Sequence, residues 1–202
     1  MTPLTRRATA EYRRATQAQR EAGARWYIEA HEIARDQADE HGVTIEVASG
    51  VIAATSPRLG WGPNVMIAER MLASRGTLDH GGLSRSLQQA RHIYAGADPK
   101  VVLGGPKTRA FYVAILTAGE SGRAVIDRHA WDMLTGERGA TSPTAKQYAT
   151  AAEMMARAAK IVGIGVHELQ ATTWVAWRSR FWSKTAFGHN PQPMLEGARS
   201  WN

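Results

Sequence analysis

Residues 104–132 read GGPKTRAFYVAILTAGESGRAVIDRHAWD, and the interpretation of the whole chain depends on this stretch. A glycine pair leads into Pro106, a residue that suits the first position of a helix. The preceding segment 98–103 predicts a short helix that Asp98 can cap. We therefore expect two helices joined by a tight hairpin at Gly104 and Gly105. An apolar run follows and ends at Asp127.

The predicted hairpin has the composition of a phosphate-binding turn. Gly104 and Gly105 let another backbone, such as a phosphodiester, approach closely. The helix that follows offers free N–H groups and the positive end of its dipole to an anion. Lys107, Thr108 and Arg109 add donors and positive charge beside it. A plain helix end followed by a helix start explains the same glycines, so the residues alone leave both interpretations open.

A second candidate group lies at the end of the quoted stretch. Asp127 follows the apolar residues 124–126 and precedes a predicted helix, so its carboxylate can cap that helix. The same carboxylate can stabilise cationic sugar chemistry, activate a water or deprotonate an amine. His129 either holds the loop by local hydrogen bonds or supports this chemistry. The residues leave both roles open.

Helical patterns dominate the rest of the chain. Apolar side chains recur at helical spacing within 5–41, 64–75, 84–95, 143–163 and 166–183. The almost continuously apolar segment 43–54 suits a core helix, although its β-branched residues also fit a strand. The sequence thus predicts an all-α fold of about eight or nine helices. Within it we expect a basic N-terminal helix or arm (1–22), one helical domain (23–183) and a C-terminal tail (184–202).

Charge and composition narrow the class of partner. The 202 residues include 25 Lys and Arg against 18 Asp and Glu, which gives a net charge of +7 and favours a polyanion such as DNA. The chain has no cysteine, which excludes disulfides and thiolate metal sites and fits a reducing cytoplasm. No apolar stretch is long enough for a membrane span, and the histidines lack zinc-type spacing. We expect no membrane partner, no metal and no cofactor.

The order of these motifs resembles the helix-hairpin-helix DNA glycosylases of the endonuclease III class. In that family a glycine-rich hairpin ends in Lys-Thr-Ala, and Val-Asp-Thr-His follows further along. Here Gly-Gly-Pro leads to Lys107 and Thr108, and Ile-Asp-Arg-His ends at His129. The similarity spans roughly residues 44–136 and includes ASGVIAATSPRLGWGPNVMIAERML and QQARHIYAGADPKVVL. The DRHAWD motif also resembles small actinobacteriophage proteins, which implies a divergent phage-encoded member.

The resemblance implies roles for particular residues. Asp127 would be the catalytic carboxylate, and Lys107 would form a Schiff base with the sugar in a bifunctional member. Thr55 and Arg58 lie in the loop that the family inserts into the DNA stack. Trp61 can stack on a base or plug an abasic gap, or fold back on the core. The remaining candidate DNA contacts are Gly104, Gly105, Thr108, Arg109 and Arg128.

Three functions follow as expectations. The first is a DNA glycosylase that binds a flipped base between the 44–75 helices and the 106–136 region, with lyase activity if Lys107 attacks the sugar. The second is a phage enzyme that modifies DNA bases on the same scaffold. The third is a non-catalytic DNA-binding protein, which Gly-Gly-Pro favours because the family hairpin usually reads Leu-Pro-Gly-Val-Gly. We expect a cytoplasmic location, in the bacterial host if the protein is phage-encoded.

Overall fold

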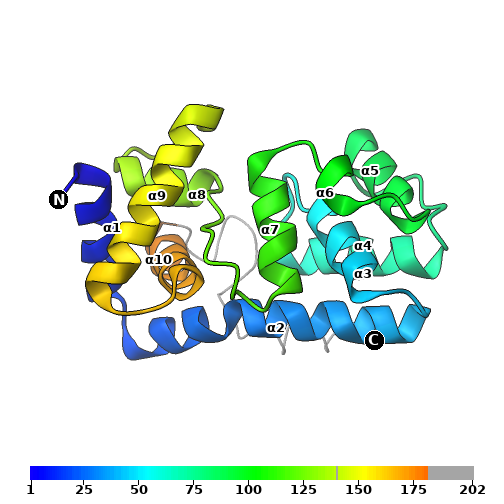
Figure 1. Cartoon of the computed structure of the whole chain (residues 1–202), viewed down its shortest axis with the longest axis horizontal. Coiled ribbons are helices and arrows are strands. Elements are labelled where there is room, and N and C mark those ends of the chain that lie inside the picture. The colour runs from blue at the N-terminus through cyan, green and yellow to red at the C-terminus, as the bar shows by residue number, and fades with distance from the viewer. Residues whose placement is uncertain (140, 182–202) are drawn as a thin grey trace. The chain divides into compact units, whose positions relative to one another are not determined.

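The computed structural model describes residues 1–139 and 141–181, and every regular element in these ranges is an α-helix (Figure 1). The predicted all-α class is therefore confirmed. The described residues form ten helices rather than eight or nine, because the 5–41 segment divides at Ala15, whose backbone is extended. The bounds are α1 (Pro3–Arg14), α2 (Gln17–His41), α3 (Ile45–Thr55), α4 (Trp61–Ala73), α5 (Ser84–Tyr94), α6 (Pro99–Val102), α7 (Pro106–Leu116), α8 (Arg128–Thr135), α9 (Ala145–Val162) and α10 (Val166–Phe181).

The helices group into two compact units. Unit 1 contains residues 1–27 and the described residues from Gly119 onward, and unit 2 contains residues 28–118. The expected basic N-terminal helix or arm (1–22) lies in unit 1, where α1 packs against α8, α9 and α10, and the expected helical domain (23–183) contributes residues to both units. The expected tail (184–202) lies outside the described residues. No helix in the described ranges combines the length and the apolar character that a membrane span requires.

Unit 1 has a continuous apolar core between α1, α8, α9 and α10. Ile126 and Leu134 contribute from the α8 region, Met155 from α9, and Leu169 and Trp177 from α10, all of them buried. Full burial of such side chains stabilises a fold by about 1.5–3 kcal/mol each. The stretch that ends in Asp127 is therefore anchored on one side by core packing.

The polar helix α1 packs because its buried acid has a partner. Glu11 is buried and accepts a hydrogen bond from the guanidinium of Arg180 on α10. Arg7 donates to the carbonyl of Leu134 at 3.2 Å. A buried carboxylate requires such a partner, and sequence spacing alone does not show one that lies so far along the chain. The first helix is thus packed into unit 1.

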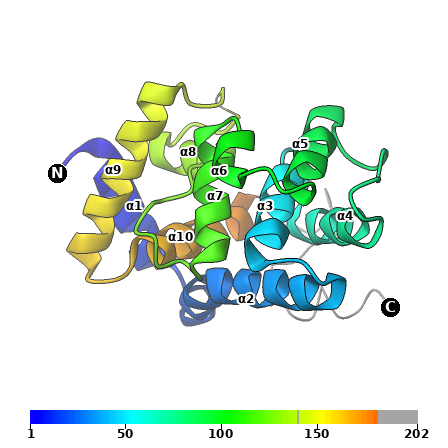
Figure 2. The same cartoon turned by 45° about the vertical axis from the view of Figure 1, so that its right-hand side comes forward.

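Unit 2 is built around α3, which contacts α4, α5 and α7 (Figure 2). Thr44 caps the start of α3 by accepting from the N–H of Val47. All residues of α3 from Ala48 to Thr55 are buried, as expected for a helix that is surrounded by others. Of the two interpretations of the apolar segment 43–54, the helix is confirmed.

His167 of α10 is a buried histidine at the centre of unit 1. Its side chain is 4% exposed, and its ring lies edge-to-face on Tyr27 with centroids 5.0 Å apart. Burial lowers the pKa of His167 to about 4, against a smaller opposing effect of the Gly119 backbone. The imidazole is therefore neutral in the folded protein at neutral pH, whereas an unfolded chain protonates it below about pH 6.5.

Acidification should consequently destabilise the protein through His167. Because the folded pKa lies below the unfolded one, the stabilisation is complete above about pH 6.5 and is lost as the pH falls toward 4. We expect a loss of about 2–3 kcal/mol in unfolding free energy between pH 7 and pH 4. Urea unfolding of wild type and His167→Gln at several pH values between 7 and 4 measures this loss of unfolding free energy. His92→Gln, an exposed histidine on α5, is the control; equal pH dependence in wild type and His167→Gln would contradict the expectation.

Candidate functional site

Asp127 is held in a fixed orientation at the start of α8. Its Oδ1 accepts from the backbone N–H of Ala130 at 2.7 Å, so it is the N-cap of α8. Its Oδ2 accepts from the indole N–H of Trp174 on α10 at 2.9 Å. The side chain is half-buried rather than enclosed. The carboxylate thus serves as a helix cap and also remains accessible, so capping and chemistry are compatible.

Aromatic and cationic groups surround this carboxylate within unit 1. Trp174 makes an edge-to-face contact with Trp26, with ring centroids 6.0 Å apart. The guanidinium carbon of Arg178 lies 4.6 Å from the Trp174 ring centroid. The ring of His129 approaches Trp174 edge-on at 6.4 Å. The result is a half-buried acid beside an imidazole, an arginine and two indoles.

The charge of Asp127 influences several neighbouring groups. Burial lowers the pKa of His129, and the negative charge of Asp127 partly opposes this effect. Burial also lowers the pKa of Arg178, again opposed by Asp127. The pKa of Tyr27 is raised well above its usual value, first by burial and then by Asp127. With its lowered pKa, the His129 imidazole is neutral at neutral pH and can either donate or accept a hydrogen bond.

An open pocket of about 250 Å³ lies beside the first turn of α8. Arg128, Asp132, Arg138 and Gly139 line it. The backbone N–H of Gly139 donates to Oδ2 of the buried Asp132 at 3.2 Å. The exposed Arg128, next in sequence to Asp127, is therefore positioned at a concave and positively charged part of the surface, as a DNA contact would require.

The two helices expected on either side of Gly104 and Gly105 are α6 and α7 of unit 2. Residues 103–105 connect α6 to α7, with Gly105 as the N-cap of α7 and Pro106 in its first turn. Thr108 donates its hydroxyl to the carbonyl of Gly105 at 3.0 Å. Arg109 donates to the carbonyl of Leu103 at 2.5 Å. The first N–H groups of α7 have no partner within the helix, so this end retains the character of an anion-binding turn.

A further cation reaches the hairpin from α5. The guanidinium of Arg85 lies 3.1 Å from the position that a β-carbon on Gly104 would occupy. Because Gly104 has no side chain, the end of the flexible Arg85 side chain can lie beside it. The sequence predicted that a phosphodiester would approach at this position. Arg85 and Arg109 together make the surroundings of the hairpin more basic than the quoted stretch alone indicates.

Lys107 extends from α7 toward the end of α3. Its ammonium donates to the hydroxyl of Ser56 at 3.1 Å and lies 5.2 Å from the ring centroid of Phe111. Ser56 is the C-cap of α3, and the negative end of a helix dipole favours a cation there. Lys107 is half-buried, so its amine is positioned by contacts inside unit 2.

The three DNA contacts predicted around the α3–α4 connection lie in different positions, with Thr55 at the end of α3, Arg58 in the loop and Trp61 at the start of α4. Thr55 is 2% exposed and donates to Asn64 at 2.7 Å, so its side chain is directed into unit 2 rather than toward the surface. Arg58 is exposed and has a backbone φ of 66°, a left-handed conformation that is uncommon outside glycine. Trp61 is half-buried and packs edge-to-face on Phe111, with centroids 6.2 Å apart.

The predicted site residues thus fall into two groups. Asp127, Arg128 and His129 lie together in unit 1. Unit 2 holds the hairpin and the loop after α3, where Lys107 and Trp61 share the neighbour Phe111. The predicted residues therefore form two separate candidate sites, one in each unit.

The sequence did not point to Trp174 as the second donor to Asp127. It is 47 residues away from Asp127 along the chain, so no local pattern relates the two. The same holds for Arg178, which lies over the ring of Trp174. The sequence does contain one signal for the pair. Arg178 follows Trp174 by one helical turn, a spacing at which a guanidinium can lie over an aromatic ring.

Comparison with known proteins identifies a family without an assigned activity. The model of a family described as "Family of unknown function (DUF7178)" matches residues 1–181. The chain therefore belongs to this family. No curated protein and no solved structure matches the chain.

Proposed function

We propose that this protein is a DNA glycosylase-like enzyme that acts on a base flipped out of DNA, with Asp127 as its catalytic carboxylate. The main support for the proposal is the orientation and the exposure of the Asp127 side chain. Its carboxylate is oriented by the Ala130 N–H and the Trp174 indole, and it remains half-exposed. The basic hairpin before α7 and the resemblance of the motif order give further support.

The chemistry assigned to Asp127 is electrostatic. When the bond between C1′ and the base breaks, its electron pair leaves with the base and the sugar develops oxocarbenium character. A carboxylate that is already oriented stabilises that positive charge without further reorganisation. Water then attacks C1′ and releases a proton, and the neutral imidazole of His129 is a nearby group able to accept one. Trp174 and Trp26 provide the aromatic surface on which an extruded base can stack.

Release of a free base is the decisive measurement. Duplexes that carry damaged or modified bases, and host genomic DNA, are incubated with the full chain, and the products are analysed by mass spectrometry. A free base supports the glycosylase. A heavier nucleoside would instead indicate the base-modifying alternative, and binding without any product would indicate the non-catalytic one. That last alternative is favoured by the contacts of Lys107, whose ammonium is held by Ser56 and Phe111.

Lyase activity is a separate expectation that concerns Lys107. If this amine attacks C1′, borohydride should trap a covalent protein–DNA adduct on abasic DNA, and Lys107→Gln should abolish it. Lys100→Gln on α6 is a matched control in the same unit, because Lys100 is exposed. A wild type that never forms the adduct would leave Lys107 as a DNA contact or a structural residue and would make the enzyme monofunctional.

A further inference from the structure

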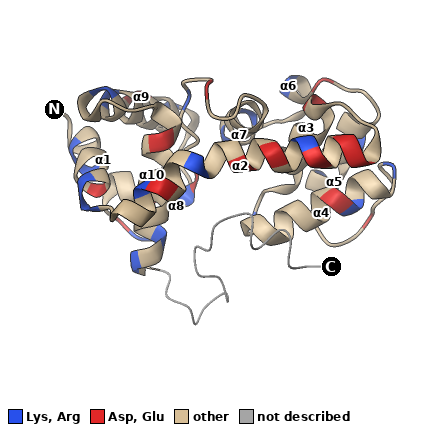
Figure 3. Ribbon diagram, turned by 90° about the horizontal axis from the view of Figure 1, so that it is seen from below, with Lys and Arg blue, Asp and Glu red and all other residues tan. Residues whose placement is uncertain are grey.

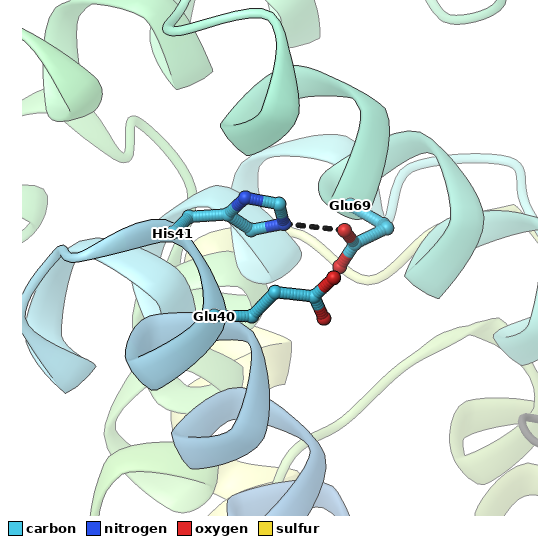
Figure 4. A group of neighbouring side chains, drawn as sticks. All are labelled: Glu40, His41 and Glu69. Atoms are coloured by element: carbon cyan, nitrogen blue, oxygen red, sulfur yellow. Dashed lines mark hydrogen bonds and ion pairs between the residues drawn. The ribbon is translucent and has the colours of Figure 1, made fainter.

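Three potential metal ligands meet in unit 2, on residues to which the proposed function assigns no role. Glu40 and His41 end α2, and Glu69 reaches them from α4 (Figure 4). One ligand atom from each side chain lies within 4.8 Å of the other two. His41 Nε2 and Glu69 Oε1 are hydrogen bonded. The three side chains therefore converge on one point from two separate helices.

This cluster is more than an acidic patch on the surface. The side chain of His41 is only 14% exposed and that of Glu69 is 34% exposed, so two of the three ligands are anchored in the fold. Figure 4 shows the carboxylates of Glu40 and Glu69 directed toward each other, and one oxygen of each lies within 4.8 Å of the other. Two carboxylates at such a distance repel each other unless a proton or a cation lies near them.

The local charge also favours a cation. The chain carries +7 overall, but residues 28–41 of α2 hold five acidic residues and a single arginine (Figure 3). Asp39 and Glu40 lie in the last turn of α2, where the helix dipole already presents negative charge. Carboxylates at this end of a helix are unfavourable unless a positive charge offsets them. A bound metal ion would supply that charge.

We propose that Glu40, His41 and Glu69 bind a divalent transition-metal ion, with Zn²⁺ as the best fit. One imidazole and two carboxylates form a nitrogen and oxygen donor set that suits zinc. Mg²⁺ and Ca²⁺ prefer oxygen donors alone, and Ca²⁺ takes more of them. Around a tetrahedral zinc the ligand atoms lie roughly 3.3 Å apart. All three ligand atoms already lie within 4.8 Å of one another, and a rotation of the exposed Glu40 side chain would bring them to that spacing.

The ion would join the end of α2 to α4. With three protein ligands, a tetrahedral ion keeps a fourth position for water. Binding would stabilise unit 2, because the ligands come together only in the folded chain. The sequence offered no such signal, since Glu69 is 28 residues from His41 and no histidine pair has metal-binding spacing. This inference is independent of the proposed function, because none of its tests measures DNA chemistry.

Calorimetry with Zn²⁺ alone tests the site, on the full chain without a histidine tag and after chelator treatment. We expect saturable binding of one ion per chain and a rise in Tm. Co²⁺ in its place should give the visible absorption of a tetrahedral site. Mg²⁺ and Ca²⁺ should bind at least about tenfold more weakly. Equal affinity for all of these ions would show a simple acidic surface and would overturn the proposal.

Substitutions locate the ion. Glu69→Gln and His41→Gln should each weaken Zn²⁺ binding by at least about tenfold and remove the rise in Tm. His92→Gln and Glu46→Gln change exposed residues of the same unit in the same way, and both should bind as the wild type does. If His41→Gln fails to fold, Glu40→Gln at the exposed end of the cluster tests the same site. Unchanged affinity in Glu69→Gln, or no saturable binding in the wild type, would refute the assignment.

Discussion

Asp127→Asn is expected to reduce base release by roughly 10³-fold, because it removes the charge that faces the developing sugar cation. DNA binding should change little, since the hairpin and Arg128 are untouched. The substitution also has a structural cost. Asp127 accepts from two N–H donors, those of Ala130 and Trp174, and an amide has only one acceptor oxygen. One donor therefore loses its partner, which costs about 1–3 kcal/mol of stability.

A double substitution separates the chemical effect from the structural one. Trp174→Phe removes the indole donor, so Asp127→Asn combined with Trp174→Phe restores the balance of donors and acceptors without restoring the charge. We expect the double variant to regain part of the stability that Asp127→Asn loses and to remain inactive. Single-turnover base release and urea unfolding provide the two measurements. Activity that recovers together with stability would remove Asp127 from the mechanism.

Gly23→Ala is expected to destabilise unit 1 by about 3 kcal/mol or more, the upper end of what overpacking costs. Gly23 lies where α2 meets α10. An added β-carbon there would lie 2.1 Å from the hydroxyl oxygen of Thr172 and 2.5 Å from its backbone N and Cα. Thr172 is fully buried. Two of the three closest atoms belong to the α10 backbone, so the whole helix would have to move.

Gly62→Ala is the matched control, because Gly62 also lies in a helix and a β-carbon there meets nothing within 4 Å. It should leave stability unchanged or raise it by up to about 1 kcal/mol. Thr172→Ala should not rescue Gly23→Ala, since the backbone contacts remain. Urea unfolding monitored by circular dichroism measures all of these variants. A Gly23→Ala protein as stable as wild type would show that α2 and α10 do not pack so closely.

Much of the local structure was predictable because it depends on neighbouring residues. The N-cap role of Asp127 follows from a carboxylate placed just before an apolar periodic segment. The hairpin follows from Gly104, Gly105 and the helix-starting Pro106. Helix α3 follows from an apolar run that is too long and too rich in small residues for a strand. In each case the deciding contacts lie within a few residues along the chain.

What the sequence did not show depends on residues that are far apart along the chain. Thr55 was expected to contact DNA because of its place in a loop motif, but Asn64 holds it inside unit 2. The burial of α1 depends on the pairing of Glu11 with Arg180, which no local pattern reveals. The grouping of Glu40 and His41 with Glu69 likewise arises only when α4 packs near the end of α2. Tertiary contacts of this kind override local patterns. The division into two units also depends on tertiary contacts, so the sequence does not show it.

Because a ribosome synthesises the chain from its N-terminus, the division of α2 between the two units affects the order in which these units can fold. Among the residues that the structure describes, unit 2 is one uninterrupted segment, residues 28–118, whereas unit 1 needs the first 27 residues together with those from Gly119 onward. A nascent chain can therefore complete unit 2 while α1 has emerged without α8, α9 and α10. The buried face of α1 therefore stays exposed while more than a hundred further residues are synthesised, because the helices that cover it begin at Arg128. Domains generally fold as units during translation, so we expect α1 to pack only after α8, α9 and α10 have been made.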